Sequence, residues 1–185
     1  MTLKELTVDQ RRNAERQKFA SVLMSGSIPK QSYLRYLINQ YYCYHALENH
    51  KVFKLPNELL KRCDNIQEDI NELKKDLDWQ LDDQSVITPS TLNYIQHVES
   101  NIDLEDQFIA HIYVRYLGDM RGGQMISKKV PGSGSYYDFD NPGQLSTSIY
   151  TLLNDGMAEE AKKVFNFATQ LFIEMYDMML EKNEL

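Results

Sequence analysis

The sequence predicts a single all-α domain. Apolar residues recur three or four positions apart over long stretches, as at Leu34, Leu37, Tyr41 and Tyr44, and this spacing places them on one face of a helix. No segment shows a convincing alternation of apolar and polar residues, which is the pattern of a half-buried strand. A chain of 185 residues has the length of one domain and can bury a sizeable core.

Two helices are predicted in the first 50 residues. The first begins at Thr2, which with the glutamate three residues later matches a capping box. It extends to about Met24, and the pattern allows a break near Arg16. Pro29 opens the second helix, which ends near His50.

Two more helices are predicted in the middle of the chain. The third is expected from about Asn57 to Leu81, and the fourth from Pro89 to near Asn101. Trp79 is expected to belong to the core. The charged side chains of the third helix are expected to form a solvated face; they are Glu68, Asp69, Glu72, Lys74 and Lys75.

The last third of the chain is expected to hold three helices and one long loop. Asp103 is the expected cap of a fifth helix that continues into a glycine-rich stretch. A loop follows at residues 130–135, and the next four residues are expected to be irregular. Asn141 caps a further helix with Pro142 at its first position. The final helix has an apolar face formed by Val164, Phe165, Ala168, Leu171, Phe172 and Met175.

Three glycines, Gly118, Gly122 and Gly123, fall within six residues of the fifth helix. Each costs roughly 1 kcal/mol relative to alanine inside a helix, or about 3 kcal/mol together. One interpretation is a helix end with a glycine cap. The other is a bent helix that lets a flat ligand lie against bare backbone, and Asp119, four residues after Arg115, favours it. Taken alone, that spacing also fits a surface ion pair.

Composition and charge exclude some classes of function. The formal net charge of −7 argues against a general nucleic-acid binder, which needs a basic face. No apolar run approaches the roughly 18 residues of a membrane span, and the first residues lack a signal-peptide core, so residence in the cytoplasm is the default expectation. Cys43 and Cys63 form neither a disulfide framework nor a metal-binding spacing.

Residues 116–124 read Tyr-Leu-Gly-Asp-Met-Arg-Gly-Gly-Gln, and this segment resembles the distal-helix signature of the heme oxygenase family. Residues 110–115, which precede it, are also similar to that family. Leu3-Lys4-Glu5 and Ala14-Glu15 followed by Phe19 resemble the family's first helix. Residues 41–48 and 161–172 resemble its second and last helices, so the resemblance covers nearly the whole chain.

The resemblance implies a heme oxygenase-like fold in which heme lies between the first helix and a kinked, glycine-rich distal helix. It implies O2 activation on the iron, cleavage of heme to biliverdin, iron and carbon monoxide, and electrons from a ferredoxin or a reductase. The catalytic residues that it implies are Asp119 as the organiser of water and protons, with Arg115 and Tyr44 as its partners. The heme-contacting residues that it implies are Lys4, Arg11, Glu15, Tyr113, Gly118, Gly122, Gly123 and Phe165.

The chain departs from the family's pattern on the proximal side. The axial histidine of the family would stand three residues before Ala14, and that position is Arg11, whose guanidinium has no lone pair to offer iron. No histidine occurs before His45. Two basic residues expected in the helix after Asn141 are also missing, and Arg11 and Arg121 are candidates for the replacement of their charge.

Two functions therefore remain open. The first is a divergent heme oxygenase, in which water or an unexpected side chain completes the coordination of the iron. The second is a non-catalytic relative that binds heme or another tetrapyrrole, or acts as an interaction protein. A helix-rich di-iron oxidase is disfavoured, because the chain lacks the paired Glu-x-x-His spacing that such sites need.

Overall fold

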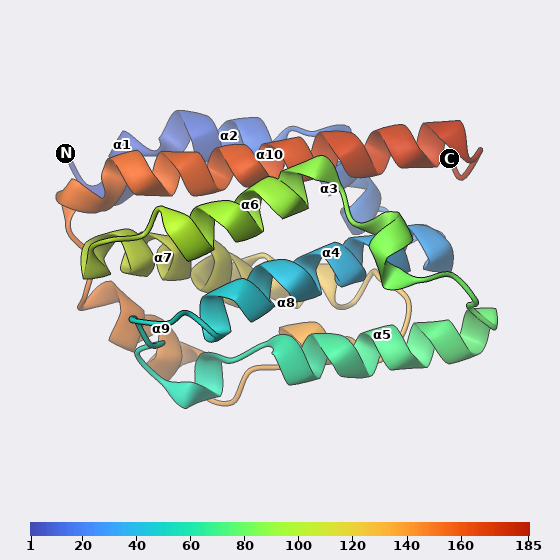
Figure 1. The fold of residues 1–185 in the computed structure, drawn as a ribbon, viewed down its shortest axis with the longest axis horizontal. Coiled ribbons are helices and arrows are strands. Elements are labelled where there is room, and N and C mark those ends of the chain that lie inside the picture. Colours follow the sequence, from blue (N-terminus) through green and yellow to red (C-terminus); the bar gives the residue numbers. More distant parts are fainter.

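The computed structural model describes residues 1–185, in which helices are joined by turns and loops and no strand occurs (Figure 1). The α-helices are α1 (Leu3–Leu6), α2 (Val8–Glu15), α3 (Lys18–Met24), α4 (Lys30–Glu48), α5 (Cys63–Leu77), α6 (Pro89–Ser100), α7 (Glu105–Arg121), α8 (Gly123–Ile126), α9 (Pro142–Tyr150) and α10 (Ala158–Glu181). Short 3-10 turns occur at Glu58–Leu60, Asp83–Val86, Ser135–Tyr137 and Asp155–Met157. The prediction of a single all-α domain is confirmed. None of the helices combines the length and the apolar character that crossing a membrane requires.

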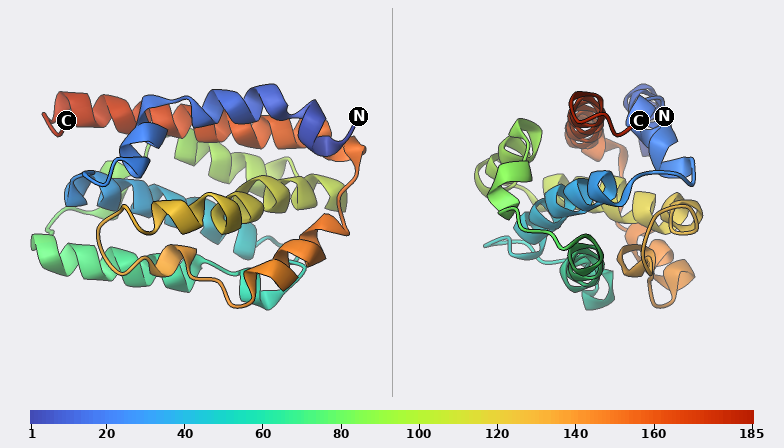
Figure 2. Two further views of the ribbon diagram at one scale, coloured as in Figure 1. Left: turned by 180° about the vertical axis from the view of Figure 1, so that it is seen from behind. Right: turned by 90° about the vertical axis from the view of Figure 1, so that its right-hand side faces the viewer.

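The helices pack in layers around α4 and α7. In the end-on view of Figure 2, α10 and the N-terminal helices lie on one side, α5 lies on the opposite side, and α4 and α7 lie between them. Helix α10 packs along α2, α6 and α7, whereas α4 packs against α5 and α6. The core is continuous from α3 to α10, where Phe19, Tyr36 and Phe172 form a cluster of tilted rings. These contacts bury the apolar stripes that the sequence pattern predicts.

Most predicted boundaries agree with the structure. The first helix breaks at Arg16, and the helices that start at Pro89 and Pro142 begin where expected. The third helix is shorter than the predicted span from about Asn57 to Leu81, since α5 begins at Cys63 and ends at Leu77. Trp79 therefore follows the helix and is only partly buried against the core.

The cap of α7 also differs from the prediction. Leu104, not Asp103, is the residue at the N-cap, and the side chain of Gln107 accepts hydrogen bonds from the backbone N–H groups of both. A long polar side chain in the first turn thus satisfies two backbone amide groups at the start of the helix.

The face of α5 that was predicted to be solvated instead holds the loop after α8. Asp69 is 2% exposed, and its carboxylate accepts hydrogen bonds from the backbone N–H groups of Ser135 (3.0 Å) and Tyr136 (2.8 Å). Arg62 donates from the other side to the carbonyl oxygen atoms of Tyr136 (2.8 Å) and Asp138 (3.0 Å). The prediction of a solvated face was thus wrong for Asp69, because the charge compensates buried backbone groups that distant residues bring to it.

The glycine-rich stretch divides one long helix into two. Helix α7 ends at Arg121, and α8 begins at Gly123, with Gly122 alone between them. The N–H of Gly122 still bonds to the carbonyl of Gly118 at 2.9 Å, so the break lies directly after that hydrogen bond. A helix end with a glycine cap is not observed, because Gly122 has helical dihedral angles (φ −70°, ψ −33°) and α8 follows it directly. That a flat ligand lies against the bare backbone of this stretch stays a prediction.

Candidate tetrapyrrole-binding site

A cavity of about 750 Å³ lies between the N-terminal helices and the pair α7 and α8. Helices α4 and α10 contribute further side chains to its walls, and 17 of its 27 lining residues are hydrophobic. Ligand pockets in proteins typically measure roughly 300–1,000 Å³ and have mostly apolar walls with a few polar groups. The cavity therefore has the size and the lining of a site for a large, flat, mainly apolar molecule.

The three glycines of the interrupted helix line this cavity in different ways. A Cβ atom at Gly118 would have no neighbour within 4 Å, so the backbone there faces open space. A Cβ atom at Gly122 would lie 3.4 Å from the carbonyl oxygen of Gly118. A Cβ atom at Gly123 would overlap the ring of Tyr137, so protein packing requires a glycine at that position. Gly118 and Gly122 thus leave room in the cavity, whereas Gly123 leaves room for Tyr137.

Asp119 presents its carboxylate to the cavity between two tyrosines. Tyr44 donates a hydrogen bond to one carboxylate oxygen, and Tyr136 donates to the other at 3.1 Å. Burial raises the pKa of Asp119 to about 7, although these hydrogen bonds and the charge of Arg115 act in the opposite direction. A carboxyl group with a pKa near neutrality can both accept and release a proton at physiological pH.

Arg115 lies beside this carboxylate without forming an ion pair with it. Its guanidinium donates a hydrogen bond to the side-chain oxygen of Gln40 at 3.3 Å and lies 4.2 Å from the centre of the Tyr94 ring. Its Nε atom is buried and has no partner. The alternative of a surface ion pair between Arg115 and Asp119 is excluded, because both residues line the cavity.

The opposite wall holds the residues expected on the proximal side. Arg11, Ala14 and Glu15 of α2 line the cavity, as does Phe165 of α10. Arg11 pairs with Glu15 at 3.3 Å, and its Nε atom is buried without a hydrogen-bond partner. The structure therefore places an arginine at the wall where the resemblance implies a histidine.

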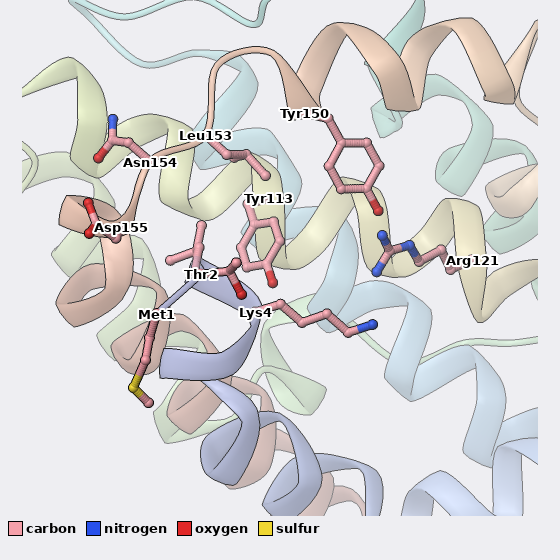
Figure 3. A pocket seen from close by; sticks show the side chains of 10 residues that line it. Met1, Thr2, Lys4, Tyr113, Arg121, Tyr150, Leu153, Asn154 and Asp155 are labelled. Carbon is pink, nitrogen blue, oxygen red and sulfur yellow. The ribbon is translucent and has the colours of Figure 1, made fainter.

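A smaller cavity of about 400 Å³ adjoins the first and shares Tyr113 and Arg121 with it. Figure 3 shows the side chains of Lys4, Tyr113, Tyr150 and Arg121 directed into one space. The guanidinium of Arg121 lies 5.1 Å from the centre of the Tyr150 ring. Neither Lys4 nor Arg121 forms a salt bridge within the chain, so this end of the cavity offers two cations to an anionic ligand.

None of the four histidines lines either cavity. His45 is exposed on α4, and His50 stacks on Phe53. His97 and His111 are buried together and both contact the carboxylate of Glu160. Burial opposes the ionisation of Glu160, but the hydrogen bonds from the two histidines outweigh it and lower its pKa to about 2. Burial also lowers the pKa of His111 to about 4, so that ring is neutral at physiological pH.

Sequence reasoning missed several polar residues of the cavity and its network, among them Gln40, Tyr136 and Tyr137. Gln40 and Tyr137 line the cavity, and Tyr136 completes the pair of hydroxyl groups around Asp119. Gln40 also donates to the hydroxyl of Tyr136 at 3.1 Å. The excess of tyrosine in the sequence, with 12 residues, is the one signal that pointed to a polar interior.

The fold and the cavity together define an all-α protein with a large, mostly apolar cavity between its N-terminal helices and an interrupted glycine helix. The family model of heme oxygenase matches residues 1–141. The chain belongs to the heme oxygenase family.

Individual relatives and solved structures agree with this assignment. The chain is 33% identical over 153 residues to a heme oxygenase of Guillardia theta, covering 75% of this chain and 64% of that protein. It is 25% identical over 220 residues to heme oxygenase 1 of Rattus norvegicus, covering 98% and 73%. The chain thus spans slightly less than two thirds of the length of several curated relatives that it matches.

Two solved structures share the fold. Heme oxygenase from Leptospira interrogans superposes with a TM-score of 0.76 at 28% identity, over 93% of this chain and 97% of that one. Heme oxygenase-1 from the cyanobacterium Synechocystis, solved in complex with heme, superposes with a TM-score of 0.78 at 22% identity, over 97% and 93%. The expected heme oxygenase-like fold is confirmed.

Proposed function

We propose that this chain binds heme in the large cavity and cleaves it oxidatively to biliverdin, iron and carbon monoxide. Membership of the family supports the class of substrate. The observation that carries the proposal is the open backbone of Gly118 next to the carboxylate of Asp119, on one wall of a cavity of about 750 Å³. O2 and electrons from a ferredoxin or a flavoprotein reductase complete the proposed reaction.

The glycine wall gives the proposed substrate a close approach to the backbone. When bound, heme would supply the iron at which O2 is activated. Because Gly118 has no side chain, the chain leaves the space beside it open for the substrate. A bulky side chain there would block both the ring and the oxygen.

Asp119 would deliver protons to the reacting oxygen. Its carboxylate is oriented by Tyr44 and Tyr136, and the buried Arg115 supplies positive charge nearby. A carboxyl group in this setting can hold an ordered water molecule and exchange a proton with it. Tyr44, Arg115 and Asp119 are accordingly the proposed catalytic residues, with Tyr136 as a positioning residue.

Lys4 and Arg121 would bind the carboxylate groups of the substrate at the polar end of the site. Both are free of internal salt bridges, and the hydroxyl groups of Tyr113 and Tyr150 lie in the same space. Arg121 lies on the interrupted helix itself. The resemblance instead implies basic residues in the helix after Asn141. The apolar middle of the cavity would hold the ring, with Glu15 and Phe165 on the opposite wall.

A second candidate function is the binding of a tetrapyrrole without turnover. The observation that favours it is Arg11, which lines the proximal wall while no histidine reaches the cavity. The residues present therefore fit the ring and its carboxylate groups but do not offer the iron an imidazole. Coordination by water, or by another side chain of the cavity, is what the first proposal requires.

One experiment separates the two functions. Purified protein is titrated with hemin, and ascorbate or a ferredoxin system is then added in air while the visible spectrum is followed. A Soret band that decays into a biliverdin band supports cleavage. A stable band supports binding alone, and the absence of any saturable band contradicts the cleavage of heme and its binding without turnover.

An Arg11→His variant is the companion measurement. If Arg11 occupies the position of the axial ligand, the variant gains the spectrum of a histidine-ligated heme. An unchanged spectrum would show that residue 11 does not face the iron.

A further inference from the structure

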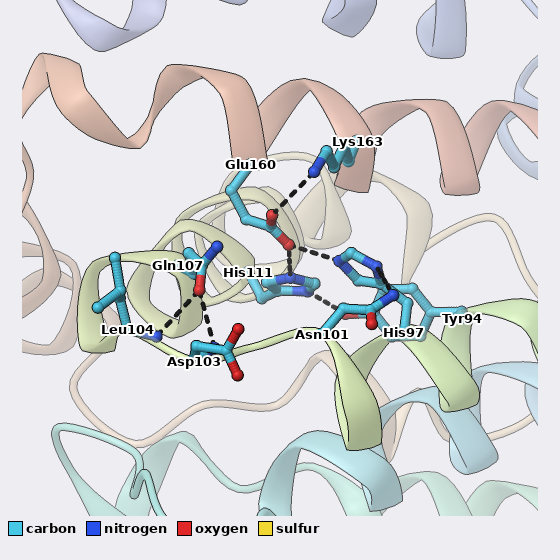
Figure 4. A network of polar contacts seen from close by, with 9 residues as sticks. All are labelled: Tyr94, His97, Asn101, Asp103, Leu104, Gln107, His111, Glu160 and Lys163. Atoms are coloured by element: carbon cyan, nitrogen blue, oxygen red, sulfur yellow. Dashed lines mark hydrogen bonds and ion pairs between the residues drawn. The ribbon is translucent and has the colours of Figure 1, made fainter.

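A second polar cluster lies outside both cavities, where α6, α7 and α10 meet. His97, His111 and Glu160 are 8%, 0% and 5% exposed, and each comes from a different helix (Figure 4). The Nε2 atom of His97 lies 2.6 Å from Oε2 of Glu160, and that of His111 lies 2.7 Å from the same oxygen. One candidate ligand atom from each residue lies within 4.8 Å of the other two.

The convergence of both rings on one oxygen distinguishes this cluster from a chain of separate hydrogen bonds. The other carboxylate oxygen, Oε1, has only the exposed ammonium group of Lys163 near it, at 3.8 Å. Two imidazole nitrogens and one carboxylate oxygen therefore lie close enough together to bind a single ion. This set of three donors is the one that catalytic zinc sites and non-heme iron(II) sites use.

The groups behind the two rings hold them in this orientation. The hydroxyl of Tyr94 lies 2.6 Å from Nδ1 of His111, and the side-chain amide of Asn101 lies 3.4 Å from Nδ1 of His97. Metal-bound histidines are usually fixed in the same way, by a partner on the ring nitrogen that does not bind the metal. The rings are also close to parallel, at 28°, with centroids 5.7 Å apart.

We propose that His97, His111 and Glu160 form a binding site for one divalent transition-metal ion, separate from the heme cavity. Binding needs no net loss of protons from neutral rings. In the metal-free protein each Nε2–H donates to Glu160; on binding, each proton moves to Nδ1, and Nε2 offers its lone pair to the ion. Tyr94 and Asn101 then accept from Nδ1, the first by rotation of its hydroxyl and the second through its amide oxygen.

The chemistry of the donors selects the class of ion. Two imidazole nitrogens favour Fe²⁺, Co²⁺ or Zn²⁺ over Mg²⁺ and Ca²⁺, which prefer oxygen ligands. The absence of a thiolate argues against a copper(I) site. Entry is available beside His97, where Lys163 and Asn101 are both exposed and a lysine side chain can move aside.

The test uses the heme-free protein after treatment with a chelator. Co²⁺ is titrated with its visible absorption as the readout, and Zn²⁺ is titrated by calorimetry. Each is expected to bind tightly with one equivalent per chain. Mg²⁺ is expected to give no response. Loss of a residue that hydrogen-bonds to a metal ligand typically weakens metal binding roughly 10–100-fold. Removal of a direct ligand, in His97→Asn or Glu160→Gln, should therefore weaken it by more than about 100-fold. His45→Asn removes an exposed histidine outside the cluster and should leave the affinity unchanged.

A measurement on the unsubstituted chain guards against variants that do not fold. The ¹⁵N resonances of the histidine rings report which nitrogen carries the proton. One equivalent of Zn²⁺ should move the proton of both His97 and His111 from Nε2 to Nδ1. Unchanged resonances, or binding that survives Glu160→Gln, would overturn the proposal. Neither result depends on heme, so the site can fail without any consequence for the proposed cleavage of heme.

Discussion

The hydroxyl of Tyr136 lies 3.1 Å from Oδ1 of Asp119, and this contact joins the glycine helix to a loop that α5 holds in place. Asp69 and Arg62 hold this loop, because Asp69 accepts a hydrogen bond from the N–H of Tyr136 and Arg62 donates one to its carbonyl oxygen. The orientation of the proposed catalytic carboxylate thus depends on a helix that does not line the cavity. Substitutions outside the cavity, in the residues that hold this loop, should therefore change the position of Tyr136 beside Asp119.

Asp69→Asn should destabilise the protein and disturb the site. The amide retains one acceptor oxygen, so one of the two buried N–H groups of Ser135 and Tyr136 loses its partner, at a cost of about 1–3 kcal/mol. Denaturant unfolding measures this loss. Glu72→Gln is the matched control, because Glu72 contacts Ser133 of the same loop at the surface. If both substitutions lowered the free energy of unfolding equally, the buried contact of Asp69 would contribute no more to stability than the surface contact of Glu72.

Gly118 and Gly123 should respond in opposite ways to alanine. Gly118→Ala removes a helix-destabilising residue without a steric conflict and should stabilise the fold by up to about 1 kcal/mol, or about 2–4 °C in Tm for a chain of this size. Gly123→Ala drives a methyl group into the ring of Tyr137 and should cost about 1–3 kcal/mol. Thermal unfolding of the heme-free variants decides this, and a destabilised Gly118→Ala would contradict the open space assigned to that position.

The same open space should be needed for the ligand. Gly118→Leu fills the cavity next to Asp119 and is expected to abolish saturable heme binding while the heme-free protein stays folded. Absorption titration and circular dichroism give the two readouts. Undiminished heme affinity in this variant would place the ligand elsewhere.

Asp119 should make stability depend on pH. Its pKa is raised from 3.8 to about 7, so its contribution to folding is fully present below about pH 4 and is lost as the pH rises through 7. The wild type should therefore lose stability relative to Asp119→Asn across this window. One pKa unit corresponds to about 1.4 kcal/mol, and because Asp119 is only half-buried and solvent screens its charge, a total difference of about 1–2 kcal/mol is expected. The free energies of unfolding of the two proteins are measured from pH 4 to pH 8. A difference between them that stays constant over this range would refute the raised pKa of Asp119.

Arg121→Gln should weaken the binding of heme but not that of its dimethyl ester. An exposed or half-exposed charge pair contributes about 0.5–1 kcal/mol, which corresponds to a loss of affinity of roughly two- to sixfold. The ester lacks the negative charges and should bind both proteins alike. Arg12→Gln serves as the control, since Arg12 is exposed on α2 and lines neither cavity. A loss with heme that equals the loss with the ester would assign Arg121 a purely structural effect.

The elements of the fold that the sequence predicted are those with local signals. Proline at the first helical position predicted the starts of α6 and α9. Three glycines within six residues indicated the irregular stretch after Arg121. The predicted start of the third helix at Asn57 was wrong, because the residues after Pro56 form a single 3-10 turn rather than the helix. A proline can open either structure, and Leu60 of this turn is fully buried in the core.

The site was predictable to the extent that it lies on one helix. Arg115, Gly118 and Asp119 follow one another on α7, and Tyr44 was reached through the family resemblance. Tyr136 could not be found in this way, because it lies in a short 3-10 turn without periodicity. Its position depends on Arg62 and Asp69, which lie 67 or more residues earlier in the chain. The difference between a solvated and a buried Asp69 depends on the same long-range contact.

Carbon monoxide released per heme is the most direct measure of the proposed cleavage of heme in the cavity between α2 and the glycine helix. It is taken with the 1:1 heme complex, O2 and a ferredoxin reducing system, with catalase present to remove free peroxide. We expect about one carbon monoxide for each heme consumed, with the yield lost in Asp119→Ala. Heme that stays intact under these conditions, or that bleaches without releasing carbon monoxide, would contradict the proposed cleavage.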